Sequence, residues 1–124
     1  MHTRDAKYRK LLVDAMYTEI TSFEEFDKLK KEPAVLAYFS TEACNVCKVL
    51  KPKVQQLLKE KFPEVKMAYV KSDELPDIAG QHHIFAAPTI LVFFDRRETI
   101  RKSRNIGISE LQEAIARPYE LMFG

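Results

Sequence analysis

The chain contains only two cysteines, Cys44 and Cys47, with two residues between them. An apolar run, residues 34–39, precedes the pair, and a long amphipathic pattern, residues 46–62, follows it. A continuous apolar run of this length predicts a strand that is covered on both faces of a sheet. The cysteines are therefore expected where a buried strand ends and a helix begins, and this junction constrains the fold of the whole chain.

A cysteine at the start of a helix has a specific chemical environment. The first backbone N–H groups of a helix lack partners and its dipole is positive at that end, so a negative charge is favoured there. The pKa of the Cys44 thiol is expected to fall into the range of about 3.5–7.5 found at reactive cysteines. Cys47, one turn later, is expected to attack any disulfide that Cys44 forms. The pattern predicts a redox-active pair.

Two other interpretations of the cysteine pair remain open. The cysteines could be inert members of the core, or they could supply two ligands of a zinc site. A structural zinc site needs four ligands, and His82 and His83 would have to complete it. These histidines fall at the end of a separate helical pattern, where a solvated or helix-C-terminal role is the preferred explanation.

Length and composition limit the class of protein. A chain of 124 residues is expected to form a single domain, residues 1–124. Its net charge of +2 gives no support for binding nucleic acid or an anionic membrane. The sequence has no apolar run long enough to cross a bilayer and no signal-peptide pattern, so a cytoplasmic location is expected.

Hydrophobic periodicity predicts helices and strands in the order α-β-α-β-α-β-α-β-β-α. Strands are expected at residues 17–21, 35–39, 65–70, 87–94 and 99–106. Helices are expected at residues 3–16, from Ser22 to Pro33, at 46–62, at about 76–83, and from Ser109 to Pro118. Alternating units of this kind build a parallel sheet, to which the final hairpin adds antiparallel strands, and helices should cover both faces.

Local signals indicate how these helices begin, end and pack. Ser22–Glu25 and Ser109–Gln112 each match a capping box. Ser72 or Asp73 is expected near the start of the helix at about 76–83. Pro118 is expected to interrupt or end the last helix. The helix after the cysteines should bury one broad stripe formed by Val46, Val49, Leu50, Val54, Leu57, Leu58 and Phe62.

The last hairpin is basic, with Arg96, Arg97, Arg101, Lys102 and Arg104. Charged side chains on an edge strand guard against edge-to-edge association, which is the preferred explanation. An acidic partner is the alternative. The closing segment, residues 121–123, could pack within the molecule or form a dimer contact, so the oligomeric state is left open.

Several linked features resemble those of the thioredoxin family. Cys44-x-x-Cys47 follows a buried strand and opens a helix. Pro52 lies eight residues after Cys44, where the family has its kink proline, and Pro88 lies 44 residues after it, where the family has its cis-proline. Asp73 comes near the end of the third strand, as in the family. The combination is far more specific than a lone C-x-x-C pair.

The resemblance covers about residues 16–117 and implies the fold and the activity. The expected fold is an α/β thioredoxin fold, with a central mixed sheet of about five strands flanked by helices and residues 1–15 as an N-terminal helical extension. The implied activity is thiol–disulfide oxidoreduction on protein disulfides, with Cys44 and Cys47 as catalytic residues. A separate reductant, such as a reductase, would reset the pair, and neither a metal nor an organic cofactor is implied.

The resemblance also implies which residues meet the substrate. Pro88 is expected to be cis, with its loop packed against the cysteine pair. In the family the backbone before this proline pairs with extended substrate, which implicates Ala87. Ala43, Asn45 and Val46 surround the cysteines and complete the expected substrate-binding set.

The departures from the family pattern concern the surroundings of the cysteines. The usual tryptophan before the first cysteine is Ala43, and the usual Gly-Pro is Asn45-Val46. The family's buried acid aligns with Tyr38 and its partner lysine with Tyr69, so both charges are lost together and neither is left buried and unpaired. Proton transfer at the second cysteine is therefore in question, and a tyrosine hydroxyl or water could substitute.

Two charged neighbours act on the first cysteine in opposite directions. Lys48 favours the thiolate of Cys44 and, with the two tyrosines, forms the expected supporting set, although it could simply point to water. Glu42 opposes the thiolate, and a solvated place at the rim is preferred for it over a role as proton acceptor.

Two further functions remain as alternatives. The first is a thioredoxin-fold interaction or chaperone module whose cysteines turn over poorly. The second is an oxidant or isomerase in an exporting compartment, which would differ in its reduction potential.

Overall fold

The computed structural model describes residues 17–124, so the expected helix at 3–16 and the extension 1–15 lie outside the described residues. The elements are β1 (Thr18–Glu19), α2 (Phe23–Leu29), β2 (Ala34–Ser40), α3 (Asn45–Lys61), β3 (Lys66–Lys71), α4 (Pro76–Gln81), β4 (Thr89–Phe94), β5 (Arg97–Ser103) and α5 (Ile108–Phe123). From the first strand onward, their order is the one that the sequence predicts.

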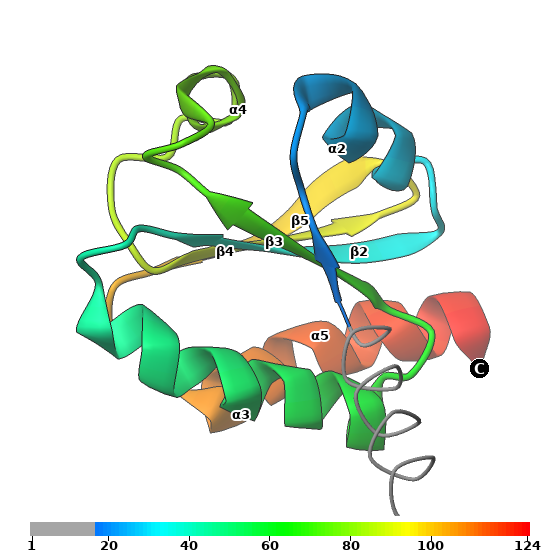
Figure 1. Ribbon diagram of the computed structural model, residues 1–124. Helices are drawn as coiled ribbons and strands as arrows, with labels where there is room; N and C mark the ends of the chain where they lie inside the picture. Colours follow the sequence, from blue (N-terminus) through cyan, green and yellow to red (C-terminus); the bar gives the residue numbers. More distant parts are fainter. Residues whose placement is uncertain (1–16) are drawn as a thin grey trace, which may run out of the picture.

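The five strands form one mixed sheet in the order β1-β3-β2-β4-β5 (Figure 1). β1, β3 and β2 are parallel, and β4 and β5 are antiparallel to their neighbours. β2 lies at the centre and every one of its residues is buried. The continuous apolar run therefore became a strand covered on both faces, as expected.

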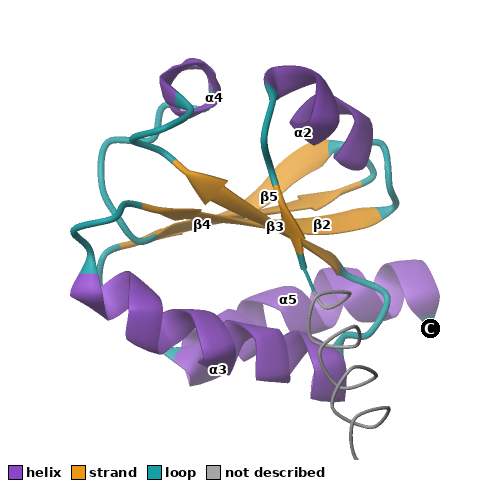
Figure 2. Ribbon diagram, in the orientation of Figure 1, coloured by secondary structure: helices purple, strands orange, loops and turns teal. Residues whose placement is uncertain are grey.

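The helices form a layer on each side of the sheet, with α3 and α5 on one face and α2 and α4 on the other (Figure 2). Alternate residues of β2 point to opposite faces and join two separate hydrophobic cores. Leu36 and Tyr38 join the core under α3 and α5, whereas Val35 and Phe39 join the core under α2 and α4. Among the described residues, no helix combines the length and the apolar character needed to span a bilayer.

The N-terminus of α2 is capped as the sequence predicts. The Ser22 hydroxyl accepts a hydrogen bond from the Glu25 backbone N–H at 3.1 Å. The Glu25 carboxylate reaches back to the backbone N–H of Thr21 at 3.1 Å, one residue before the N-cap. The helix then ends at Leu29, before the proline that was expected to close it.

The expected caps of α4 and α5 are wrong. The N-cap of α4 is Leu75, not Ser72 or Asp73, and it makes no side-chain cap bond. Those two residues belong to a turn directly after β3, and the helix begins only at the proline that follows Leu75. In α5 the N-cap is Gly107, again without a side-chain bond, because the backbone is already helical at Ser109.

Pro118 does not end the last helix, which continues to Phe123. A proline inside a helix removes one backbone hydrogen bond and crowds the preceding turn. Aromatic side chains after Pro118 pack against their neighbours. The Tyr119 ring lies 5.0 Å from the ring of Phe62, the C-cap residue of α3, and Phe123 lies 4.8 Å from Tyr119.

The apolar stripe of α3 is narrower than expected. Cys47, Leu50 and Val54 are buried at a spacing of three to four residues, which defines the face toward the sheet. Val46 and Val49 lie on the outer side and are 61% and 60% exposed. Helical geometry explains the difference, because residues one position before each buried one are rotated by about 100° away from the core.

The structure places the basic hairpin and the closing segment. β5 is an edge strand of the sheet, and the basic residues predicted for the last hairpin lie on it or beside it. At the C-terminus, Phe123 packs against α5 itself, whereas Leu121 is 79% exposed.

Candidate active site

Cys44 is the N-cap residue of α3, in the strand-to-helix junction that the sequence predicts. Its backbone is extended (φ −85°, ψ 98°), and its Sγ accepts a hydrogen bond from the Cys47 backbone N–H at 3.2 Å. The two cysteines are joined by a disulfide. Cys44 is half-buried, whereas Cys47 is only 1% exposed. An incoming reagent can therefore approach the sulfur of Cys44 more readily than that of Cys47.

The loop before β4 forms the second part of the site. The Ala87–Pro88 peptide bond is cis. Because Phe39 pairs with Thr89 in the ladder between β2 and β4, Pro88 lies beside the end of β2, from which the cysteine loop departs. Figure 1 shows this loop at the same edge of the sheet as the start of α3. Ala87 packs against the same core as Cys44.

The remaining residues of the expected set form an exposed rim around the cysteines. Ala43, Asn45, Val46 and Lys48 are all exposed. The sequence analysis missed Phe85, which is 88% exposed and precedes Pro88 by three residues. A bulky aromatic residue in a short loop before a proline was the available signal.

The rim borders two hollows in the surface. One, of about 550 Å³, includes Thr41, Asp73, Phe85 and Ala87 in its lining. The other, of about 330 Å³, lies between the start of α3 and the loop before α5 and includes Val46 in its lining. The first hollow thus adjoins the cis-proline loop, and the second adjoins the start of α3.

Asp73 contacts the cysteine loop from the turn after β3. Its carboxylate accepts a hydrogen bond from the backbone N–H of Glu42 at 3.2 Å. The Glu42 side chain is exposed, in agreement with its expected solvated place at the rim. The strand-end position of Asp73 was visible in the sequence, but its contact across the loop was not.

Two tyrosines lie directly beneath the cysteines. Tyr38 is fully buried, and its hydroxyl donates a hydrogen bond to the backbone carbonyl of Cys47 at 2.6 Å. The Tyr69 hydroxyl lies 3.1 Å from Ser40 Oγ. Burial, with a smaller contribution from Tyr69, raises the pKa of Tyr38 far above its ordinary value. Tyr38 is therefore a neutral hydrogen-bond donor to the backbone of Cys47.

A lysine completes this layer and was not identified from the sequence. Lys51 Nζ lies 4.0 Å from the ring centroid of Tyr17 and 3.9 Å from that of Tyr69. The two rings are themselves in edge contact, with centroids 6.0 Å apart. The signal available was the i, i+4 spacing between Cys47 and Lys51, which places both on one face of the helix.

The histidines lie away from the cysteines. His82 packs in the core on the α2–α4 side of the sheet, with its ring 5.1 Å from Phe26. Its Nδ1 lies 2.8 Å from the carbonyl of Ile78, which is the expected helix-C-terminal role, whereas His83 is exposed. Within residues 17–124, no three His, Cys, Asp or Glu side chains are grouped to hold a metal ion. The zinc set considered from the sequence is therefore not assembled.

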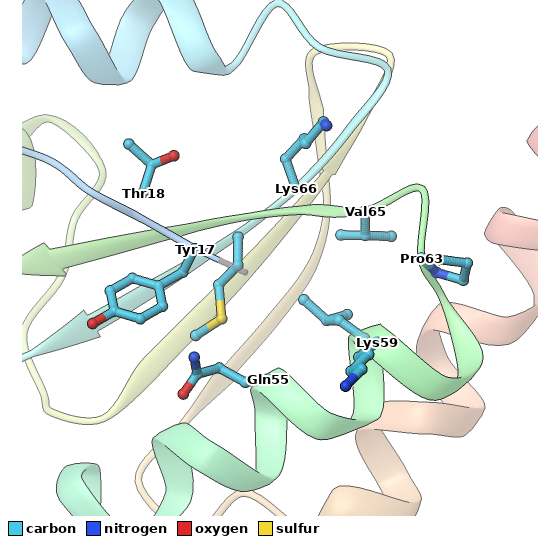
Figure 3. Close-up of a pocket in the computed structure, with 9 residues that line it drawn as sticks. Tyr17, Thr18, Gln55, Lys59, Pro63, Val65 and Lys66 are labelled. Atoms are coloured by element: carbon cyan, nitrogen blue, oxygen red, sulfur yellow. The ribbon is translucent and has the colours of Figure 1, made fainter. Parts of the chain in front are cut away.

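A further cavity, of about 230 Å³, lies toward the other end of α3 (Figure 3). Tyr17, Gln55 and Lys59 surround it, together with the start of β3. Its lining comes mainly from the last turns of α3 and the start of β3 and includes neither cysteine. The cavity is thus separate from the candidate active site.

Comparison with known proteins agrees with this geometry. The family model described as Thioredoxin matches residues 16–117. The thioredoxin-like protein YdfQ of Bacillus subtilis is 29% identical over 105 residues, covering 85% of this chain and 91% of YdfQ. Thioredoxin-1 of Saccharomyces cerevisiae is 28% identical over 102 residues, covering 82% and 97% of the two chains. The crystal structure of thioredoxin O2 from Arabidopsis thaliana in the oxidised state has a TM-score of 0.75 and 20% identity, covering 85% of this chain and 96% of that one.

The last comparison concerns the fold alone, whereas the family model spans most of the sequence and includes the cysteine pair. The accessible sulfur at a helix start, its buried partner and the neighbouring cis-proline loop have the chemistry that such a family requires. The chain belongs to the thioredoxin family and is a thiol–disulfide oxidoreductase.

Proposed function

We propose that this protein reduces disulfide bonds in protein substrates, with Cys44 as the nucleophile and Cys47 as the resolving cysteine. The observation that carries the assignment of roles is the difference in accessibility between two sulfurs on one helical turn. Cys44 is half-buried at the N-cap of α3, and Cys47 is buried behind it. The helix start favours the Cys44 thiolate over the thiol.

In the first step the Cys44 thiolate attacks one sulfur of the substrate disulfide. A mixed disulfide forms, and the other substrate sulfur leaves as a thiolate that takes up a proton. In the second step the Cys47 thiolate attacks Cys44, the bond between Cys44 and the substrate breaks, and the second substrate thiolate is released. The substrate gains two electrons and two protons, and the Cys44–Cys47 dithiol becomes a disulfide.

The substrate is proposed to lie across the exposed rim. Ala87 and Pro88 would present the backbone that pairs with an extended segment, and Ala43, Asn45 and Val46 would contact it from the cysteine side. The half-buried position of Ala87 beside the open hollow supports this arrangement.

The supporting roles and the setting belong to the same proposal. Lys48 would favour the thiolate from the exposed side of α3, and Tyr38 and Tyr69 would hold Cys47 from beneath. A separate reductant, such as a reductase, would return the disulfide to the dithiol. The cytoplasm is the compartment proposed, because a reducing environment keeps such a pair in its active form.

Insulin reduction followed by turbidity tests the proposal, using the parent protein and the variants Cys44→Ser and Cys47→Ser. The parent should accelerate precipitation, and Cys44→Ser should lose that activity. Cys47→Ser should accumulate a mixed disulfide that mass spectrometry detects, because the second step is blocked. Equal and negligible rates for the parent and Cys44→Ser would instead support a binding module. A titration in glutathione buffers reports the reduction potential, and a strongly oxidising value would indicate an oxidant or isomerase.

A further inference from the structure

Lys51 lies one helical turn after Cys47, on the buried side of α3. Side chains four residues apart on a helix are neighbours, with Cβ atoms about 5–6 Å apart. Lys51 is half-buried, and its Nζ lies over the rings of Tyr17 and Tyr69 at 4.0 and 3.9 Å. Its charge is thus held between the helix and the sheet, in the layer beneath Cys47.

Within this layer, a series of side-chain contacts through two tyrosines connects Lys51 to Cys47. The ring of Tyr69, which lies under the ammonium, stacks on Tyr38 with centroids 6.0 Å apart. Tyr38 in turn donates its hydroxyl hydrogen bond to the Cys47 carbonyl. Both tyrosines are neutral groups, so they separate Lys51 from Cys47 without screening the charge as water would.

The other charged groups around this layer are already paired or exposed. In the register of the sheet, Tyr38 lies in a cross-strand row with Glu19 of β1 at one end and Lys102 of β5 at the other. Lys71 of β3 lies 3.6 Å from Glu19 and 3.9 Å from Glu74. The exposed charges nearby are Glu42 in the cysteine loop, Asp73 after β3, Lys48 on α3 and Glu110 on α5.

We propose that Lys51, held by the rings of Tyr17 and Tyr69, is the positioned cation that stabilises the thiolate of Cys47. Beneath this cysteine the chain carries a neutral, buried Tyr38, which can donate a hydrogen bond but cannot take up a proton near neutral pH. Lys51 acts through its field and does not touch the reacting sulfur, so it is a positioning residue. Its effect is to raise the fraction of Cys47 that can attack the mixed disulfide.

The inference rests on the proposed role of Cys47 as the resolving cysteine, but its test needs only the thiol. In the full chain carrying Cys44→Ser, Cys47 is the single cysteine. Its pKa can be measured from the ultraviolet absorbance of the thiolate as a function of pH. A failure of insulin reduction would leave this measurement unaffected, so the two proposals fail separately.

In that background, Lys51→Met removes the charge and keeps a chain of similar shape. The pKa of Cys47 should rise by about one unit, because the thiolate loses the positive charge that favours it. Lys51→Arg keeps the charge, so the pKa of Cys47 should stay close to its value with Lys51 present. Lys53→Met is the matched control, because Lys53 is exposed on the same helix and its removal should change the Cys47 pKa much less.

A second variant covers the case in which Lys51→Met does not fold, as judged by circular dichroism. Tyr17→Leu keeps the charge but removes one of the rings that hold it, so a smaller rise in the Cys47 pKa is expected. An unchanged pKa in Lys51→Met overturns the proposal. It is also overturned if Lys51→Arg raises the pKa as much as Lys51→Met, or if, with Lys51→Met unfolded, Tyr17→Leu leaves the pKa unchanged.

Discussion

Tyr38 lies directly opposite Tyr69 in the parallel ladder between β2 and β3, and their rings are stacked. These are the two positions at which the family pattern has a buried acid and its lysine. In the structure the two positions are direct neighbours across the strands, so the side chain at one faces the side chain at the other. A charge introduced at Tyr38 alone would be buried beside a neutral ring.

The first prediction concerns this pair. Tyr38→Asp should lower the free energy of unfolding by about 3–5 kcal/mol, because a carboxylate would be buried without a partner. Tyr69→Lys should lower the free energy of unfolding by less, since Tyr69 is only half-buried. In the double variant the two charges can pair, and a favourable coupling of about 1–3 kcal/mol is expected.

Denaturant unfolding of the reduced protein measures this double-mutant cycle. Tyr38→Phe is the control that keeps the ring and removes only the hydroxyl bond to Cys47, at a cost of about 1 kcal/mol. If the change in the free energy of unfolding of the double variant equals the sum of the two single changes, the two positions are not coupled.

The second prediction concerns the pH dependence of stability. Burial lowers the pKa of His82, and the nearby ammonium of Lys30, 3.1 Å from Nε2, acts in the same direction. Just below the ordinary pKa of histidine, the unfolded chain therefore binds more protons than the folded one. The contribution of neutral His82 to the free energy of unfolding is fully present above the ordinary pKa of histidine. It is lost as the pH falls through the lowered pKa of the folded state.

Thermal melts across this pH range provide the measurement. Between neutral and mildly acidic pH, the melting temperature of the parent should fall by about 2–4 °C more than that of His82→Gln. His83→Asn, a change at the exposed neighbour, should follow the parent curve. Parallel curves for the parent and His82→Gln would contradict the prediction.

The third prediction concerns Arg101, which ties the edge strand β5 to the end of α4. Its guanidinium donates to the carbonyl of His82 at 2.7 Å and to that of His83 at 3.2 Å, while Glu98 orients it from the same strand. The segment that follows, residues 84–88, leads into the active-site loop. Arg101→Ala should therefore loosen this segment without unfolding the sheet.

Hydrogen exchange read by mass spectrometry tests this effect. Amides in residues 82–88 should exchange about fivefold faster in Arg101→Ala, equivalent to about 1 kcal/mol of lost hydrogen bonding. Arg97→Ala, an exposed basic residue on the same strand, is the matched control. Equal exchange in the two variants would show that Arg101 does not restrain the loop.

The local pattern of residues was sufficient to predict the topology and the position of the cysteines. The apolar run of β2, the amphipathic helix after it and the spacing to Pro88 depend on neighbours in sequence, and their periodicity reflects burial directly. The capped start of α2 at Ser22 was predicted for the same reason, because its hydrogen bond closes over three residues.

Contacts between segments that are distant in sequence depend on the tertiary structure. The exposure of Val46 and Val49, the continuation of α5 past Pro118 and the position of Lys51 over two tyrosine rings depend on how layers pack. Periodicity says which side of an element is apolar, but not what lies against it. The layer beneath Cys47 is built from β2, β3, the residue before β1 and α3, and its electrostatics follow from that packing.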